Sequence, residues 1–228
     1  MTREVHVGVL ASGRGSNFQA LWAAEQAGVL GARLVCLLSD NPSANALQRA
    51  ADRGLQTRLV DAGGKRGQLS ETAQGEIVAF LRHHEVDLVC LAGFMRIVGR
   101  TLLEAFPNAI LNIHPSLLPS FPGLEAPRQA LEHGVKVTGC TVHLVDAGID
   151  TGPIVTQAAV AVRVDDTPET LSARILEQEH RIYPEAVRLW ASGELAAHGR
   201  RIGVRDRIDT RAPRANDASH HSNSEARP

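Results

Sequence analysis

Within ten residues, an amide, an imidazole and two prolines follow in fixed order, Asn112-Ile-His114-Pro115-Ser-Leu-Leu-Pro119, and Asp150 comes after a strand-like stretch. Amide, imidazole and carboxylate groups can stabilise an oxyanion and move a proton during acyl transfer. Asn112 and His114 point to the same side of an extended chain because they are two positions apart. A lone histidine is more often structural, but the amide and the rigid prolines favour a catalytic site for acyl transfer.

A second cluster, Gly13-Arg14-Gly15-Ser16-Asn17, stands between a predicted strand and a predicted helix. Backbone amides and the helix dipole converge on an anion at such a junction, so we expect a bound phosphate. Ser16 and Gln19 have capping-box spacing, which supports a helix start and leaves a merely capped turn as the alternative. The dinucleotide fingerprint is incomplete because Phe18 replaces its third glycine, although Asp40 could hold a ribose. A mononucleotide-like phosphate fits better.

Two further segments are candidates for a ligand pocket. Arg96, in Gly-Phe-Met-Arg-Ile, follows a strand-like run and should project near the carboxyl edge of the sheet, where open α/β folds bind ligands. The alternative is a core-packed helix start with a solvated arginine. Asp146 and Asp150 lie in a Gly-rich loop, where aspartate often only forms a turn, and this alternative is serious for Asp146. No spacing of His, Cys, Asp and Glu matches a metal site, so we predict none.

The elements that must position these residues alternate between strands and helices in the first half of the chain. Apolar periodicity predicts strands at 5–11, 34–38, 57–60, 86–92 and 109–113, and helices at 17–27, 46–53 and 68–84. This alternation indicates an α/β fold with an open, mostly parallel twisted sheet and helices on both faces.

The second half of the chain differs, because two β-rich stretches, 135–145 and 154–164, are joined by a Gly-rich loop without a helix. They should pair as antiparallel strands. A long helix is predicted from Pro168 to about Leu195, with a core-facing apolar stripe that also contains Gln178 and, at its edge, Glu179. Such groups are rarely buried without a partner, so we expect them to face a ligand or a hydrogen-bond network.

The composition indicates one domain over residues 1–199. A formal net charge of -1 argues against a nucleic-acid-binding protein, and no apolar segment has the length of a signal or membrane span. We therefore expect small-molecule ligands and a cytoplasmic location. After Gly199, Arg, Pro and small polar residues dominate, which predicts a disordered tail over 200–228 because so few apolar groups cannot offset the entropy of ordering.

Together, these segments resemble the glycinamide ribonucleotide formyltransferase family, the folate-dependent enzymes of purine synthesis. The resemblance covers about residues 5–195 and rests on ordered segments: Gly13–Asn17, Leu91–Ile97, Asn112–Pro119, Phe121–Gly123, Asp150–Pro153 and Gln178–Pro184. It implies a Rossmann-like formyltransferase fold and transfer of a formyl group from 10-formyltetrahydrofolate to the amine of glycinamide ribonucleotide. It also implies that 10-formyltetrahydrofolate is a cosubstrate and that neither a metal nor a permanently bound cofactor is needed.

The resemblance assigns roles to individual residues. Asn112 and His114 stabilise the tetrahedral oxyanion, while Asp150 orients or charges His114 and assists proton transfer through water. The residues assigned to the ribonucleotide phosphate and ribose are Gly13, Arg14, Gly15, Ser16, Asn17 and Glu179. Those assigned to folate are Met95, Arg96, Ile97, Val98, Asn112, Val145, Asp146 and Asp150. Residues 1–105 then form the ribonucleotide-binding half and 106–199 the catalytic and folate-binding half.

Leu176 departs from the family pattern, which often has a longer polar residue there that helps to bind phosphate. This weakens the inference of ribonucleotide affinity and leaves the chemistry unchanged.

Two other functions remain as alternatives. A formyltetrahydrofolate hydrolase, in which water replaces the amine, resembles the chain around the same three residues but adds an N-terminal regulatory domain, for which we expect no room before Val5. A nucleotide-binding dehydrogenase or sensor that uses the 13–17 turn and Asp40 is more distant. A non-catalytic α/β domain would leave the co-occurrence of the six segments unexplained. For assembly, we expect a monomer or a weak homodimer.

Overall fold

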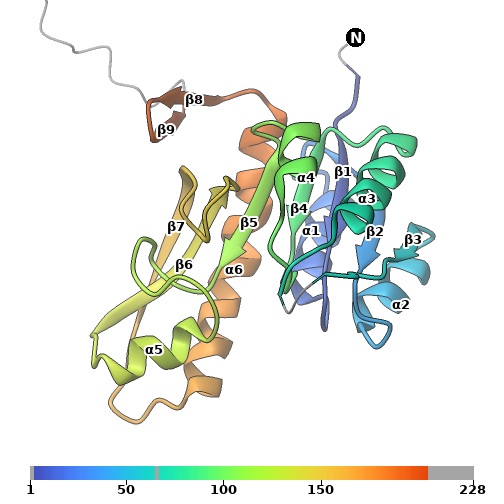
Figure 1. Cartoon of the computed structure of the whole chain (residues 1–228). Coiled ribbons are helices and arrows are strands. Elements are labelled where there is room, and N and C mark those ends of the chain that lie inside the picture. Colours follow the sequence, from blue (N-terminus) through green and yellow to red (C-terminus); the bar gives the residue numbers. More distant parts are fainter. Residues whose placement is uncertain (1–2, 65–66, 205–228) are drawn as a thin grey trace, which may run out of the picture.

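The computed structural model describes residues 3–64 and 67–204, and one seven-stranded sheet organises them (Figure 1). The strands lie in the order β3-β2-β1-β4-β5-β6-β7. Their bounds are β1 His6–Leu10, β2 Arg33–Ser39, β3 Gln56–Leu59, β4 Leu88–Leu91, β5 Ile110–His114, β6 Val137–Leu144 and β7 Ile154–Ala161. The first five strands pair in parallel, whereas β6 is antiparallel to both β5 and β7. The prediction of a mostly parallel sheet with antiparallel strands in the second half is confirmed.

Helices pack on both faces of this sheet. Those in the described residues are α1 Ser16–Gln26, α2 Asn45–Ala51, α3 Glu71–His83, α4 Arg100–Ala105, α5 Ala126–Glu132 and α6 Pro168–Ala191. Apolar residues of α1, α2 and α6 form one core cluster, and those of α3 and α4 form a second one. Figure 1 shows α3 and α4 in front of the sheet and α6 behind it.

Because side chains alternate between the two faces of a strand, a single strand contributes apolar residues to both core clusters. Val7 and Val9 of β1 belong to the cluster with α1 and α6, whereas Leu10 belongs to the other cluster. Gly8 lets α3 approach closely, because a Cβ there would lie 2.5 Å from Leu81 Cδ2. The strand is therefore apolar on both faces, as is typical of a buried parallel strand.

Capping residues set the helix bounds, and these caps differ from prediction at three helices. Ser70 caps α3 by accepting a hydrogen bond from the Ala73 N–H, so this helix begins at Glu71 and not at residue 68. The predicted capping box of Ser16 is wrong, because the N-cap of α1 is Gly15 and no side chain caps it. The long helix α6 ends at Ala191 and not at about Leu195 as predicted, because Gly193 two residues later has a φ of 69°, the left-handed conformation that ends helices.

Three short elements were not predicted: α4, α5 and the hairpin of β8 Leu195–His198 and β9 Arg201–Val204. The prediction that the tail starts at residue 200 is wrong for β9, whose Ile202 packs against the core cluster that contains α6. The remainder of that predicted tail, 205–228, lies outside the described residues. In the described part of the chain, no helix is both long and apolar enough to cross a membrane.

Candidate active site

Three residues predicted to be catalytic meet at the carboxyl end of β5. Asn112 and His114 lie on this strand, and Asp150 comes from the loop between β6 and β7. His114 Nδ1 is 3.3 Å from Asp150 Oδ2, and Asn112 Nδ2 is 3.4 Å from Asp150 Oδ1. The i, i+2 spacing therefore places the amide and the imidazole against the same carboxylate, as an acyl-transfer site requires.

A second histidine, His143, orients the Asn112 amide. It lies opposite Asn112 in the antiparallel pairing of β5 and β6, and its side chain is 2 % exposed. Its Nδ1 is 2.9 Å from the Leu144 carbonyl, which can only accept, so Nδ1 carries the hydrogen. The other nitrogen, Nε2, then accepts from Asn112 Nδ2 at 3.1 Å. This bond directs the amide N–H groups into the site.

His114 lies between two hydrogen-bond acceptors. Its Nε2 is 2.8 Å from the carbonyl oxygen of Phe121, and its Nδ1 faces Asp150. Both nitrogens can donate together only in the imidazolium form. Burial lowers the pKa of His114, and the Asp150 charge and the Phe121 carbonyl counteract only part of that effect. Burial therefore makes the charged form of His114 easier to deprotonate than that of an exposed histidine.

Asp150 is held in place by the backbone as well as by its neighbours. Its φ of 54° is in the left-handed region, which a non-glycine residue adopts only where the surrounding structure enforces it. Its Oδ2 accepts from the Gly123 N–H at 2.8 Å. Burial raises the pKa of Asp150, but the Gly123 N–H and the neighbouring His114 oppose that increase, and the pKa lies below its ordinary value. The carboxylate is therefore ionised at neutral pH.

The predicted phosphate turn lies between β1 and α1, at the carboxyl edge of the sheet. Gly13 and Arg14 are exposed, and no atom lies within 4 Å of the position that a Cβ of Gly13 would take. Gly15 has a φ of 75°, and a Cβ there would lie 2.9 Å from Ala46 Cα and Cβ. A side chain at residue 15 would both strain the backbone and collide with α2. The turn is open on one side and closely packed on the other.

Asn17 and Glu179 meet beside this turn. Asn17 Nδ2 donates to Glu179 Oε2 at 2.7 Å, which joins the start of α1 to the middle of α6. Burial raises the pKa of Glu179, and the Asn17 hydrogen bond opposes the increase. Within the described residues, the buried Asn17 Oδ1 has no hydrogen-bond partner. Of the two polar residues of the α6 stripe, Glu179 is the buried one and Gln178 is partly exposed.

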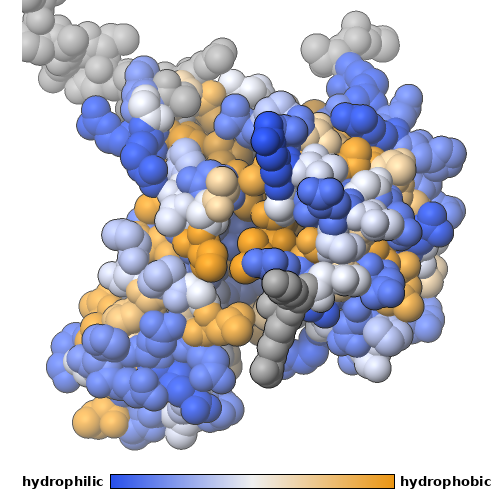
Figure 2. Space-filling view, in the orientation of Figure 1, coloured by the Kyte–Doolittle hydropathy of each residue, from blue (hydrophilic) through white to orange (hydrophobic). Residues whose placement is uncertain are grey.

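The residues predicted to bind folate fall into two groups. Met95 and Ile97 are apolar side chains that are 58 % and 42 % exposed after β4, whereas Val98 is buried beneath them in the core. Val145, which is partly exposed, donates its N–H to the Ile110 carbonyl and so ties the start of the next loop to β5. Asp146 accepts from the Gly148 N–H and the Thr151 hydroxyl, as expected of a turn-forming aspartate. Figure 2 shows hydrophobic residues around a hollow at the centre of the molecule.

Arg96 and Asp40, which were considered separately, form an ion pair. Arg96 Nε is 2.6 Å from Asp40 Oδ2, and the Ser12 hydroxyl donates to Asp40 Oδ1 at 2.5 Å. Both carboxylate oxygens of Asp40 are therefore engaged. This pairing disfavours the alternative in which Asp40 holds a ribose.

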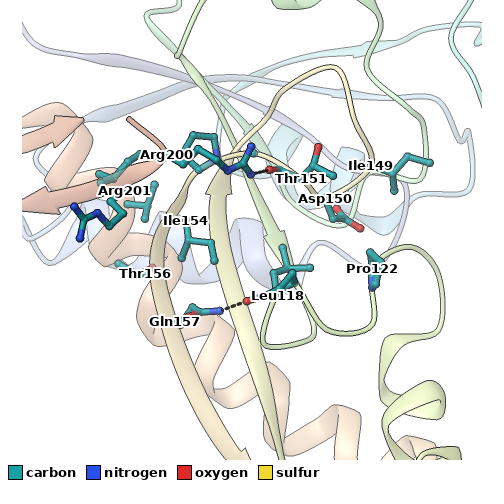
Figure 3. Close-up of a pocket in the computed structure, with 15 residues that line it drawn as sticks. Leu118, Pro122, Ile149, Asp150, Thr151, Ile154, Thr156, Gln157, Arg200 and Arg201 are labelled. Carbon is teal, nitrogen blue, oxygen red and sulfur yellow. Dashed lines mark hydrogen bonds between the residues drawn. The ribbon is translucent and has the colours of Figure 1, made fainter. Parts of the chain in front are cut away.

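A cavity of about 740 Å³ lies on the β7 side of the Asp150 loop (Figure 3). Leu118, Ile154 and Gln157 line it, together with residues 149–153 and Arg200 from the β8–β9 hairpin. The Arg200 guanidinium donates to the Thr151 carbonyl, next to Asp150. None of Gly13–Asn17 and Met95–Val98 lines this cavity, whereas Asp150 of the second predicted folate segment does.

The family model described as formyl transferase matches residues 5–187. This chain belongs to the formyl transferase family. A phosphoribosylglycinamide formyltransferase of Bacillus subtilis is 43 % identical over 180 residues, covering 79 % of this chain and 91 % of the relative. A glycinamide ribonucleotide transformylase structure from Symbiobacterium toebii is 52 % identical with a TM-score of 0.83, covering 88 % of this chain and 94 % of that one.

Other formyl transferase relatives have longer chains. The trifunctional purine biosynthetic protein adenosine-3 of Gallus gallus is 43 % identical over 84 % of this chain, which spans only 19 % of that relative. A formyltetrahydrofolate deformylase structure from Pseudomonas syringae is 26 % identical with a TM-score of 0.82, over 89 % of this chain and 66 % of that one. Transferases and a deformylase therefore share this fold.

His143 is a candidate site residue of this formyl transferase that the sequence analysis did not identify. The sequence analysis paired 135–145 only with 154–164, whereas this contact comes from the pairing of β6 with β5. With the observed register, a histidine directly opposite Asn112 must approach it, since paired side chains in an antiparallel sheet lie about 5 Å apart. In the described residues, no group of three or more His, Cys, Asp and Glu side chains is arranged for a metal ion.

Proposed function

We propose that this formyl transferase moves the formyl group of 10-formyltetrahydrofolate to the amine of glycinamide ribonucleotide, giving formylglycinamide ribonucleotide and tetrahydrofolate in de novo purine synthesis. The observation that carries the proposal is the His114–Asp150 contact at 3.3 Å with the Asn112 amide beside it. Relatives from Bacillus subtilis and Escherichia coli, each matched over 91 % of its length, are named phosphoribosylglycinamide formyltransferase. The donor is a cosubstrate, and no permanently bound cofactor takes part.

Asn112 stabilises the oxyanion of the first step. The amine nitrogen attacks the formyl carbon, and the carbonyl electron pair moves to the formyl oxygen. The Asn112 N–H that reaches Asp150 across 3.4 Å makes a weak bond and is readily exchanged for this oxyanion. The shorter bond to His143 keeps the amide in position during the exchange. One such donor typically contributes a factor of about 10²–10³ in rate.

His114 and Asp150 manage charge and protons. The oxyanion is a stronger acceptor than the Phe121 carbonyl that now receives the Nε2–H of His114, so it competes for that donor. When the intermediate collapses, the bond from the formyl carbon to the folate nitrogen breaks. That nitrogen gains a proton and the attacking amine loses one, so the step is proton-neutral overall. The ionised Asp150 assists this transfer through water and stabilises the charged imidazole.

The turn at residues 13–17 holds the ribonucleotide. Its open face at Gly13 and the start of α1 suit a phosphate, which backbone N–H groups and the helix dipole attract. Glu179 accepts from a ribose hydroxyl, and the unpartnered Oδ1 of Asn17 accepts a second donor. A buried acceptor without a partner is costly, and a hydroxyl-rich ligand removes that cost.

The segment from Met95 to Val98 and the loop from Val145 to Asp150 hold the folate donor. The exposed Met95 and Ile97 offer apolar contact to the flat folate rings, and Val98 supports them from the core. Asp150 belongs to both the donor loop and the catalytic cluster, so the formyl group is brought directly to Asn112 and His114.

A formyltetrahydrofolate hydrolase is the second candidate, and the deformylase structure with the same fold is the observation that favours it. One assay separates the two. Purified protein is mixed with 10-formyltetrahydrofolate, and tetrahydrofolate and formate are followed with and without glycinamide ribonucleotide. The transferase releases tetrahydrofolate only when the ribonucleotide is present and produces no formate. Formate release without the ribonucleotide would overturn the proposal in favour of the hydrolase.

We also propose a cytoplasmic enzyme that is a monomer or a weak homodimer and binds neither nucleic acid nor membranes. The near-neutral net charge supports the lack of nucleic-acid binding. Sedimentation velocity over a range of concentrations would measure the assembly state, and a stable higher oligomer would contradict this part of the proposal.

A further inference from the structure

Ser12 lies at the centre of a hydrogen-bonded group that joins the two predicted substrate loops. Its N–H donates to the Gly93 carbonyl at 3.1 Å, and its hydroxyl oxygen accepts from the Met95 N–H at 2.9 Å. The same hydroxyl donates to Asp40 Oδ1. Ser12 is therefore bonded on one side to the loop that carries the folate residues, while on the other side it begins the phosphate turn.

Asp40 extends this group to the side chain of Arg96. Its carboxylate is 5 % exposed and joins the Ser12 hydroxyl to Arg96 Nε, whose side chain is 28 % exposed. Hydrogen bonds in which one partner is charged are stronger than neutral ones, and these two are short at 2.5 and 2.6 Å. The buried end of Arg96 is fixed, and only its outer end remains open to solvent.

The three connected segments follow β1, β2 and β4, which are neighbours in the sheet. Ser12 follows β1, Asp40 follows β2, and Gly93 to Arg96 follow β4. Because these strands are parallel, their carboxyl ends meet at the edge where ligands of open α/β sheets bind. The group therefore connects the expected phosphate turn after β1 to the expected folate segment after β4.

We propose that Ser12 and Asp40 are positioning residues that couple the binding of the two substrates. This inference rests on the proposed function. A ligand that draws the phosphate turn into its bound position also places the Ser12 hydroxyl, and with it the Met95 N–H and the Asp40–Arg96 pair. The second ligand then finds its loop already positioned and binds more tightly. By thermodynamic reciprocity, each ligand must strengthen the other by the same factor.

The test is a titration of glycinamide ribonucleotide by calorimetry, alone and with saturating tetrahydrofolate. Tetrahydrofolate has no formyl group, so the ternary complex cannot react. We expect the wild-type Kd to fall at least about fivefold when tetrahydrofolate is present. In the variants Ser12→Ala and Asp40→Asn, the ratio of the Kd without tetrahydrofolate to the Kd with it should drop below about twofold. Each variant should keep its thermal unfolding transition, which shows that it is folded.

Asp166→Asn is the matched control, because it breaks another carboxylate–arginine pair, with Arg174, beside the start of α6 and outside both loops. This variant should keep the wild-type ratio. If Ser12 and Asp40 had only a structural role, Ser12→Ala and Asp40→Asn would weaken ribonucleotide binding equally with and without tetrahydrofolate. The ratio of the two Kd values would then stay at its wild-type value, and this result would overturn the inference. An active wild-type enzyme without coupling would overturn it too. A wild-type protein that neither binds nor formylates the ribonucleotide would instead refute the proposed function.

Discussion

The charge of Asp150 should control the protonation of His114, and Asp150→Asn removes that charge with little change in shape. His114 Nδ1 and Asp150 Oδ2 are 3.3 Å apart. Two unit charges at this distance interact by about 1 kcal/mol in water and about 5 kcal/mol at an effective dielectric constant of 20. Since both side chains are largely buried, the pKa of His114 should fall by at least about one unit in the variant.

The sign of the effect follows from the state of His114. Its pKa already lies below the ordinary value because it is buried, and the variant lowers it further. The charged imidazole that stabilises the oxyanion is then available only at lower pH. At neutral pH, kcat should fall by about 10²–10⁴, with the ribonucleotide KM little changed. The remaining activity should increase as the pH is lowered.

Two measurements check this prediction: the NMR titration of His114 and the dependence of kcat on pH. Asp146→Asn is the control for the NMR titration and should leave the His114 midpoint in place, since Asp146 lies in the same loop but bonds to Gly148 and Thr151 and not to His114. The reasoning is refuted if the His114 titration midpoint stays in place or rises in Asp150→Asn, or if kcat remains within twofold of wild type.

Three other substitutions test separate parts of the site. His143→Ala removes the acceptor that orients the Asn112 amide. Steady-state kinetics should therefore give a kcat lower by about 10- to 100-fold at an unchanged ribonucleotide KM. A change in KM with an unchanged kcat would contradict this role. Gly15→Ala introduces a Cβ that collides with Ala46 at a backbone φ of 75°. Thermal unfolding should show a free energy of unfolding lower by about 1–3 kcal/mol, and ribonucleotide binding should be weaker. A variant as stable as wild type would contradict the packing argument. Glu179→Gln keeps the acceptor for Asn17 and removes a buried charge, so the melting temperature should not fall, while calorimetry should show ribonucleotide affinity about 10- to 100-fold lower. Unchanged affinity would exclude Glu179 from the ribose site.

The sequence predicts the layers of this fold well because its central strands, such as β1 and β4, are apolar on both faces. The run that becomes β5 leads directly to Asn112 and His114, and period-two geometry places both side chains on one face. The polar Glu179 in the α6 stripe likewise indicated a buried partner, which is Asn17. Local patterns were sufficient in these cases.

Elements that depend on distant contacts were not predictable in the same way. The pairing register of β5 with β6 cannot be read from either strand alone, so the contact of His143 with Asn112 was missed. The helix α4 has six residues, less than two helical turns, which is too short for a clear periodic signal. The strand β9 has few apolar residues of its own and is stabilised by pairing with β8 and packing beside β7.

The most direct test of the central claim follows the formyl group itself. Glycinamide ribonucleotide is incubated with 10-formyltetrahydrofolate carrying an isotopic label in its formyl carbon, and wild type is compared with His114→Ala by mass spectrometry. With wild type, the label should appear on the ribonucleotide amine, and with His114→Ala this transfer should be strongly slowed in a folded protein. Label recovered only as formate, or normal transfer by His114→Ala, would contradict the account.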